Sequence, residues 1–512
     1  MNKTVTKAAA VIMTLFIMIF TMTGCGSSSS SSTTTTTAAS KTSSSSSTDT
    51  SDRYSDRDCD ATYDESTATK ITLSKTKATV SGDGAKYSDG VLTISDEGTY
   101  IISGTLTDGQ IIVDADDTDK VQIVLNGVSL TCKDAAPIYV RNADKVFITL
   151  AEGTTNTVSD SSAASYSQPD TDVTIDGAIF STCDLTVNGS GNLTVKAGYK
   201  HGIVSQDDLK ITGGNITVTA TKAALRGNDS VMIKDGTLKL TSGTDAIHSK
   251  AVVYIDGGTL TISAGDDGMH ADTDLTINGG TVNITKSYEG IEGSTVTIND
   301  GTISVVSSDD GINAAGGSDT TSTSTDDKFG GQSQPASSTA YVITINGGYV
   351  YVNASGDGID SNGSIVFAGG TTVVAGPTEN NNAPLDSGDG TGCTITVTGG
   401  LLLAVGSTGM LDLPESNDIY TTSLNASSGT QVTICDSDGK VVCTLKVPKT
   451  AAGLIFGGTD CSDYTIYTGG TYSGTLDANG FATGGTLSGG TKVSTGGTIG
   501  GAGSMGGGMM KR

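Results

Sequence analysis

Apolar residues recur at a nearly constant spacing between residues 200 and 400. Each repeat places a large apolar residue after a small one, as in Asp245-Ala246-Ile247 and Asp267-Gly268-Met269. The large residues are Ile203, Leu225, Ile247, Met269, Ile291 and Ile312, spaced by 22, 22, 22, 22 and 21 residues. Ile359 follows 47 residues later, which is one period plus a 25-residue insertion assigned to residues 316–340. Self-similarity at a fixed period of this size indicates a repeat architecture.

Each period contains three short segments with strand-like alternation. Segments such as Val253-Tyr254-Ile255 alternate apolar and polar positions with a period of two. A turn such as Asp256-Gly257-Gly258 or Asn278-Gly279-Gly280 follows, and then a further alternating piece such as Thr259–Ile262. Glycine at the recurring turn position indicates positive φ or a close backbone approach.

These features predict an all-β fold, a right-handed parallel β-helix with three strands and about 22 residues per coil. Equivalent strands of successive coils would pair about 4.8 Å apart, and stacking would join their apolar residues into one core. A β-sandwich would instead show hairpin signals, and the Leu and Asn frame of leucine-rich repeats is missing.

The expected domain order has five parts. Residues 1–24 form a signal peptide, 25–69 a lipidated linker, 70–415 the β-helix, 416–479 a C-terminal β cap and 480–512 a Gly-rich tail. Terminal caps are needed because unpaired strand edges invite aggregation. Within the C-terminal cap, residues 431–447 read as an antiparallel hairpin. Cys435 and Cys443 flank its turn, either cross-linked or as two free thiols.

The N-terminus has the composition of a secretory signal peptide. Lys3 and Lys7 precede an apolar run that ends at Gly24-Cys25. This junction resembles a bacterial lipobox, which implies lipidation of Cys25, a membrane anchor and an extracellular, cell-surface location. The alternative is that the apolar run remains as a transmembrane anchor. The Ser/Thr-rich stretch from residue 26 to about 50 fits a flexible tether.

Charge and composition exclude several functions. The chain has 55 acidic and 29 basic residues and a formal net charge of −26, so nucleic acid is excluded as a partner. The scarcity of helix-forming residues argues against a helical bundle. The chain contains no Trp, which weakens the expectation of a flat aromatic platform for crystalline cellulose.

Stacking would turn two sequence columns into lines of neighbouring side chains, here called the ladder. Two residues before the large apolar position lie His201, Ala223, Asp245, Asp267, Glu289, Asp310 and Asp357. One residue after it lie Val204, Arg226, His248, His270, Glu292, Asn313 and Asp360. Like charges about 5 Å apart repel and require compensation. Clustered carboxylates suit a hard divalent cation, and calcium is the expected cofactor.

The candidate metal ligands fall at the acidic end of the ladder. They are Asp266, Asp267, Glu289, Glu292, Asp309, Asp310, Asn313, Asp357 and Asp360. Two alternatives remain open: a solvated acidic edge without a bound ion, and a transition metal such as zinc at the histidines.

The repeat also carries a family resemblance. The turn-Gly-Gly repeat, the Asp-Gly-Ile and Asp-Gly-Met edges and the segment Val-Leu-Asn-Gly-Val at 124–128 resemble the extracellular carbohydrate-binding β-helix family of clostridia and related bacteria. The resemblance covers roughly residues 70–465. It implies a polysaccharide-lyase-like fold and binding of cellulose or pectin-like acidic polysaccharide with calcium.

Three functions follow from these observations. The first is a non-catalytic surface protein that binds plant-type polysaccharide, with Arg226, His248, His270 and Tyr288 as candidate sugar contacts. The second is a calcium-dependent, pectate-lyase-like enzyme, which would need a base beside the cation; no motif marks a catalytic residue. The third is a surface adhesin or spacer. We expect the binder, because a shared fold does not transfer activity.

Overall fold

The computed structural model describes residues 53–160, 165–167, 173–315, 338–415, 419–458 and 463–494, within a compact unit that spans residues 49–512. The expected signal peptide, Cys25, the linker up to residue 52, insertion residues 316–337 and residues 495–512 lie outside the described residues. None of the helices in the described ranges is long and apolar enough to cross a membrane.

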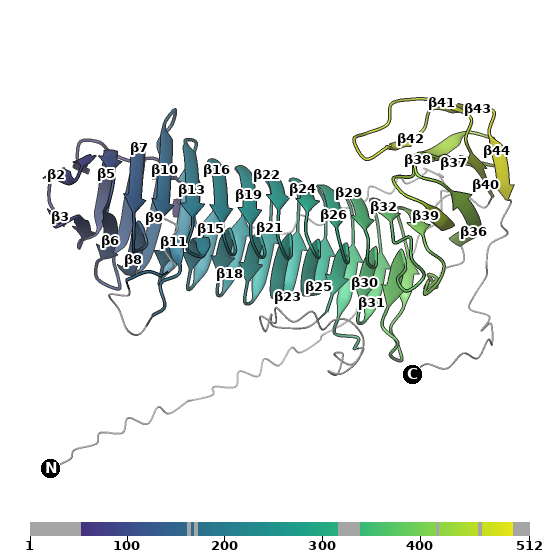
Figure 1. Ribbon diagram of the computed structural model, residues 1–512, viewed down its shortest axis with the longest axis horizontal. Coiled ribbons are helices and arrows are strands. Elements are labelled where there is room, and N and C mark those ends of the chain that lie inside the picture. Colours follow the sequence, from purple (N-terminus) through teal and green to yellow (C-terminus); the bar gives the residue numbers. More distant parts are fainter. Residues whose placement is uncertain are drawn as a thin grey trace, which may run out of the picture. The chain divides into compact units, whose positions relative to one another are not determined.

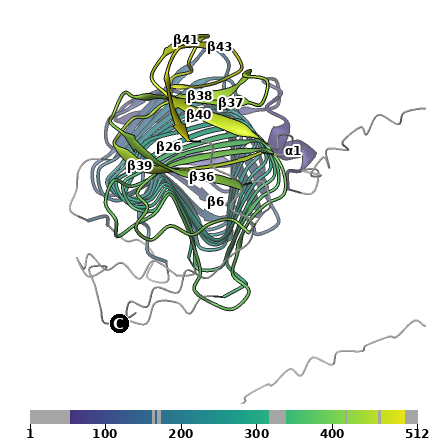
Figure 2. The same cartoon turned by 90° about the vertical axis from the view of Figure 1, so that its right-hand side faces the viewer.

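The described chain is a parallel β-helix, as predicted (Figure 1). Leu225 pairs with Ile247, Ile247 with Met269, and Met269 with Ile291, so strands of successive coils align at the predicted spacing. The end-on view in Figure 2 shows the coils superposed on one another. Residues one period apart are therefore neighbours on the surface.

Three parallel sheets run the length of the stack. The ladder sheet contains β4 (Val91–Ile94), β6 (Gln110–Asp114), β8 (Ile138–Asn142), β11 (Gly177–Ser181), β14 (His201–Ser205), β17 (Leu225–Gly227), β20 (Ile247–Ser249), the first parts of β23 (Met269–Ile277) and β25 (Ile291–Ile298), β27 (Ile312–Ala314), β30 (Ile359–Ser361) and β33 (Leu385–Ser387). The second sheet contains the first part of β7 (Lys120–Cys132), β9 (Lys145–Leu150), β12 (Asp184–Gly189), β15 (Asp208–Ile211), β18 (Ser230–Ile233), β21 (Val252–Ile255), the second parts of β23 and β25, β28 (Val342–Ile345), β31 (Ser364–Phe367) and β34 (Ile395–Val397). β5 (Gly98–Leu106) also spans two sheets, since its first part pairs with the first part of β7 in the second sheet. The third sheet contains β1 (Thr69–Lys75), the second parts of β5 and β7, β10 (Thr155–Asp160), β13 (Asn192–Ala197), β16 (Asn215–Ala220), β19 (Thr237–Ser242), β22 (Thr259–Ser263), β24 (Thr281–Lys286), β26 (Thr302–Ser307), β29 (Tyr349–Ala354), β32 (Thr371–Ala375) and β35 (Leu401–Gly406).

The core is the column of apolar residues predicted from the repeat. Ile247, Met269, Ile291 and Ile312 are completely buried and belong to one continuous apolar cluster. Burying each such side chain contributes about 1.5–3 kcal/mol. The turns between the sheets need glycine, since Gly258 has φ 82° and a Cβ there would lie 2.8 Å from the carbonyl oxygen of Gly236. The repeat therefore encodes both the core and the corners.

Antiparallel hairpins close the N-terminal end of the stack. β2 (Lys77–Ser81) pairs antiparallel with β1, and β3 (Ala85–Ser88) pairs antiparallel with β4. Both partner strands continue the parallel sheets, β1 through β5 and β4 through β6. The hairpins thus occupy edges that would otherwise be open for pairing with another chain.

Residues 53–62, here called the strap, pack on the second sheet. Their helix α1 (Asp56–Cys59) begins with a capping box at Ser55. Arg53 binds Asp256 at 2.9 Å, and Asp58 binds Lys145 at 2.8 Å. The expected linker at residues 25–69 therefore does not extend through residues 53–62, and for this part the prediction is wrong. The polar composition of this segment gave no sign that it packs on the fold, because its side chains bind polar groups of the coils rather than an apolar core.

The C-terminal region is antiparallel. β36 (Ile419–Ala426) pairs with β39 (Ala451–Gly458), which pairs with β35 of the last coil. The expected hairpin is formed by β37 (Gln431–Asp436) and β38 (Val441–Lys446), in a sheet with β40 (Tyr464–Thr468), β42 (Phe481–Thr483) and β44 (Thr491–Ser494). Cys435 and Cys443 are free thiols.

The predicted Gly-rich tail does not begin at residue 480. β42 and β44 complete the five-stranded sheet, and β43 (Thr486–Ser488) pairs with β41 (Thr471–Ser473). Phe481 supplies the physical reason, because its ring is buried and stacks on Tyr349 at 5.8 Å. A single aromatic residue among Gly and Thr anchors this segment.

Candidate cation-binding ladder

The ladder predicted from the repeat exists in the structure. Parallel register joins Val204 to Arg226, and then His248, His270, Glu292, Asn313 and Asp360 in order. The next member is Asp386, which sequence reasoning missed. Ile359 pairs with Leu385, a spacing of 26 residues, because residues 376–384 enlarge this coil. The Leu-Asp-Ser at 385–387, aligned with Ile-Asp-Ser at 359–361, was the available signal.

The carboxylates of the first column hold the next coil in place. Oδ1 of Asp245 accepts the backbone N–H of Asp267 at 3.3 Å, and Oδ1 of Asp267 accepts that of Glu289 at 3.3 Å. Oδ1 of Asp310 accepts the N–H of Asp357 at 2.5 Å. A buried N–H at the start of each strand needs such an acceptor. The acids therefore have a structural role that leaves each second oxygen available for other partners.

Asp310, Asp357 and Asp360 form the first cluster. One oxygen from each lies within 4.8 Å of the other two. Burial and then neighbouring carboxylates raise the pKa of Asp360 to about 8, and burial raises that of Asp357 to about 6. The pKa of Asp386 is raised to about 7 by burial and by Asp357. Over the described ranges, no Lys or Arg forms an ion pair with these groups.

Three further predicted ligands lie beside this cluster. Gly356 lets one of them, Asp309, approach together with Asp310 of the cluster, since a Cβ there would meet Oδ1 of Asp309 at 2.2 Å and Oδ1 of Asp310 at 2.4 Å. Asn313 is 7% exposed and its Nδ2 donates to Oε2 of Glu289 at 3.0 Å. Its Oδ1 is buried and has no hydrogen-bond partner. The acidic end thus contains a buried carbonyl oxygen that a cation would satisfy.

Asp267, His270 and Glu292 form the second cluster. Nδ1 of His270 lies 2.6 Å from Oε2 of Glu292 and 3.4 Å from Oδ2 of Asp267. Its Nε2 lies 3.2 Å from Oδ1 of Asp272. The ring of His248 stacks on that of His270 with centroids 5.1 Å apart. His270, expected among the sugar contacts, is only 1% exposed and lies between carboxylates.

The opposite end of the ladder is basic. Oδ2 of Asp176 lies 3.6 Å from Arg226, 3.7 Å from His201 and 4.0 Å from Lys200. Burial raises the pKa of Asp176, although Arg226 and Lys200 oppose the shift. The net charge of the ladder therefore changes sign along the stack.

We expect the stability contributed by His201 to disappear in acid. Burial, with the charges of Arg226 and Lys200, lowers its pKa from 6.5 to about 3. Folding therefore favours the neutral ring, a contribution present above pH 6.5 and lost as the pH falls toward 3. From pH 7 to pH 4.5, wild type should lose on the order of 2 kcal/mol more than His201→Gln in urea unfolding. Equal losses would contradict this.

The remaining predicted residues lie at the edges. Asp266 is exposed, and its carbonyl oxygen accepts the N–H of Tyr288 at 2.7 Å. The Tyr288 side chain is 38% exposed, next in sequence to Glu289. Tyr288 is therefore placed to contact a ligand on the surface of the acidic end.

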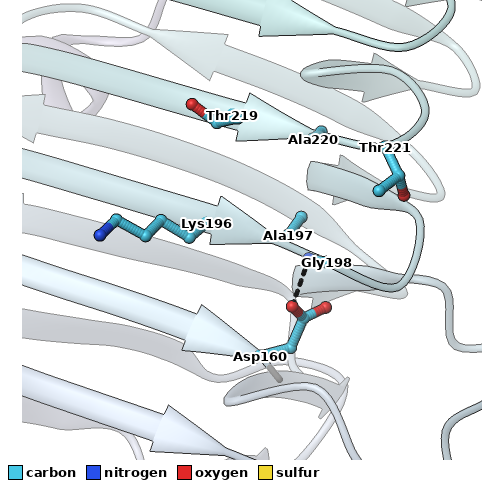
Figure 3. A pocket seen from close by; sticks show the side chains of 7 residues that line it. All are labelled: Asp160, Lys196, Ala197, Gly198, Thr219, Ala220 and Thr221. Atoms are coloured by element: carbon cyan, nitrogen blue, oxygen red, sulfur yellow. Dashed lines mark hydrogen bonds between the residues drawn. The ribbon is translucent and has the colours of Figure 1, made fainter. Parts of the chain in front are cut away.

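Two other polar sites do not resemble the ladder. A shallow pocket near the basic end is lined by Lys196, Thr219 and Thr221 over Asp160 (Figure 3). The Asp160 carboxylate accepts hydrogen bonds from the N–H groups of Gly198 and Tyr199 and from the hydroxyl of Tyr166, so it is satisfied within the protein.

A third acidic cluster, on the second sheet, consists of Asp184, Asp207 and Asp208. Lys145 lies 3.3 Å from Asp184, and Lys210 lies 3.3 Å from Asp208. These lysines already compensate the cluster, unlike the carboxylates at the acidic end of the ladder.

Comparisons with known proteins find similar sequences over part of the chain. A family model described as "Carbohydrate-binding domain-containing protein" matches residues 88–330. A protein of that description from Acetivibrio thermocellus is 44% identical over 138 residues, which are 27% of this chain and 48% of the relative. The chain thus spans about half the length of this curated relative. A solved structure, the gadolinium derivative of a polysaccharide lyase-like protein from C. thermocellum, is 36% identical with TM-score 0.41, and the match covers 46% of this chain and 93% of that one.

The family match and the curated relative agree with the resemblance drawn from the repeat. Residues 88–330, which lie within the β-helix, are similar to carbohydrate-binding domains.

Proposed function

We propose that this protein binds polysaccharide along the ladder sheet and that calcium at Asp310, Asp357 and Asp360 mediates the contact. The supporting observation is the concentration of half-buried carboxylates, with raised pKa values, that have no basic partner among the described residues. Burying charges of one sign costs free energy unless a counterion compensates them. The family match supports carbohydrate as the ligand.

The residues present fit calcium. The ion takes six to eight oxygen ligands at 2.3–2.6 Å from carboxylates, amide carbonyls and water. The cluster offers three carboxylates within 4.8 Å of one another, and the unpartnered Oδ1 of Asn313 belongs to the neighbouring coil. When bound, calcium would supply positive charge and open coordination positions for ligand oxygens.

Geometry and charge favour an acidic, extended polymer such as polygalacturonate. Equivalent positions repeat about every 4.8 Å along the stack, so a polymer aligned with it meets similar groups repeatedly. The formal charge of −26 would repel a polyanion unless cations bridged the carboxylates. Tyr288 supplies one exposed ring beside the acidic end, whereas cellulose would require a broader aromatic surface.

The proposed location of the protein is the cell surface. Lipidation of Cys25 would anchor the protein to the outer face of the membrane and display the β-helix at the cell surface, where calcium and plant polysaccharide are available. The support is the Lys-flanked apolar run and the Gly24-Cys25 junction.

Two of the candidate bases for a lyase, Arg226 and Lys200, lie far from the calcium cluster. Arg226 and Lys200 lie around Asp176, and five steps of the register separate Arg226 from Asp360. At about 4.8 Å per step these groups lie roughly 24 Å apart. A base for β-elimination must reach its proton within hydrogen-bonding distance.

Retention on immobilised polygalacturonate tests the proposal. We expect wild type to be retained with calcium and released by chelator, and Asp310→Asn combined with Asp360→Asn to lose retention by about 100-fold, roughly 2.7 kcal/mol. Asp300→Asn, in an exposed turn, is the matched control and should bind as wild type does. Retention of the double variant would contradict the site, and growth of ultraviolet absorbance from unsaturated products would favour the lyase.

A further inference from the structure

The second cluster differs chemically from the first. Asp310, Asp357 and Asp360 offer only oxygen, whereas the cluster one coil away contains the imidazole of His270 between Asp267 and Glu292. Hard cations such as calcium take oxygen ligands, while imidazole suits zinc and other first-row transition metals. The same repeat therefore presents two different sets of ligand atoms.

The distances in this cluster suit a small ion. Zinc binds nitrogen and oxygen at about 2.0–2.2 Å, which places tetrahedral ligand atoms roughly 3.4 Å apart. Nδ1 of His270 lies 3.4 Å from Oδ2 of Asp267 and 2.6 Å from Oε2 of Glu292. The contact between His270 and Glu292 must lengthen, and the Glu292 side chain is the most exposed of the three.

An independent contact orients the imidazole. Nε2 of His270 lies 3.2 Å from Oδ1 of Asp272, on the side of the ring opposite Nδ1. A ligating histidine almost always donates its other N–H to a carboxylate, carbonyl or water, which fixes the tautomer and directs the lone pair at the metal. Asp272 provides that partner, because a proton held on Nε2 leaves the lone pair of Nδ1 directed at the side of the ring where the oxygens of Asp267 and Glu292 lie, so that a cation between them would bind all three atoms.

The neighbouring coil supplies an internal comparison. His248 stacks on His270 and has a carboxylate three residues before it, with Nδ1 2.9 Å from Oδ2 of Asp245. The two histidines differ, however, in their neighbour in the following coil. The register places His270 beside His248, and Glu292 beside His270. The carboxylate that completes a set of three is therefore contributed only to His270.

We propose that Asp267, His270 and Glu292 bind a transition-metal ion of the zinc class, in a site distinct from the calcium site. The three residues supply one nitrogen and two carboxylate oxygens, and Asp272 orients the imidazole. A fourth coordination position is left for water or a ligand hydroxyl, as in zinc sites with three protein ligands. The site does not depend on the proposed polysaccharide.

Titration of the metal-free full-length chain with Zn²⁺ by calorimetry, and with Co²⁺ by visible absorption, tests the site. We expect one high-affinity zinc per chain and cobalt d–d bands of a low-coordinate site. His270→Gln should weaken zinc binding by about 100-fold or more, and Asp272→Asn by about 10–100-fold. His248→Gln is the matched control and should change affinity by less than about threefold.

The outcomes separate this proposal from the calcium site. Asp310→Asn combined with Asp360→Asn should retain zinc while losing calcium. Absence of zinc binding, equal effects of His270→Gln and His248→Gln, or loss of zinc in the Asp310/Asp360 double variant would overturn the assignment. If His270→Gln fails to fold, Asp272→Asn decides, because unchanged zinc affinity in that variant would equally overturn it. If His270 were instead an imidazolium that only neutralises the carboxylates, cobalt would give no d–d bands of a low-coordinate site.

Discussion

Calcium should stabilise the metal-free protein at neutral pH, and Asp360→Asn should abolish most of that effect while making the metal-free protein more stable. A ligand at 100 times its Kd stabilises the folded state by about 2.7 kcal/mol. Without calcium, burial and neighbouring carboxylates hold the pKa of Asp360 at about 8. Because this value exceeds the ordinary one of 3.8, ionisation opposes folding, and stability is lost as the pH rises from about 4 to 8.

The asparagine variant removes that cost and keeps the shape of the side chain. At pH 8 in chelator, Asp360→Asn should be more stable than wild type by on the order of 2 kcal/mol, measured by urea unfolding. Addition of calcium should then raise the melting temperature of wild type far more than that of the variant. A variant that is less stable than wild type in chelator would contradict the repulsion argument, and an equal calcium response would contradict the ligand assignment.

The second large effect is expected from Asp58 in the strap. Although burial alone would raise the pKa of Asp58, hydrogen bonds from Lys145 and Thr186 lower it to about 2. Asp58→Ala would leave the Lys145 ammonium, 9% exposed, without its 2.8 Å partner. Removing one member of a buried ion pair costs about 3–5 kcal/mol, and Asp184, which stays 3.3 Å from Lys145, should keep the loss at the lower end of that range. We expect that loss in urea unfolding at pH 7.

Asp56→Ala provides the control, since Asp56 lies in the same helix and is exposed. It should change stability by less than about 0.5 kcal/mol. If Asp58→Ala were equally mild, the strap would be a peripheral segment rather than part of the fold.

The fold could be predicted in detail because a solenoid converts sequence period into spatial register. The pairing of His248 with His270 and of Glu292 with Asn313 follows from counting residues. Prediction failed where the count changed, and Asp386 was missed because its coil is longer. It also failed for the strap, whose contacts at Asp256 and Lys145 join positions separated by about 90 to 200 residues and leave no periodic signal.

The chemistry of the ladder was predicted only in outline. Counting placed acids in columns, but it could not show that Asp267 and Glu292 converge on His270 rather than on Asp310. That division depends on side-chain direction. Nor could it show that Asp310 supports the backbone of Asp357 through one oxygen. Periodicity specifies neighbours, whereas rotamers and hydrogen bonds decide which neighbours share a ligand.

The strap changes how the stack should come apart. In a solenoid each coil contacts only its neighbours, so unfolding can proceed from an end one repeat at a time. Residues 53–62 bind Gln122, Lys145 and Asn188, which lie in three consecutive coils, and Asp256, which lies three coils further along the stack. If any one of these coils unfolds, the strap loses contacts that also stabilise the others. The N-terminal half should therefore unfold as one cooperative unit, whereas the acidic half can unfold locally, coil by coil.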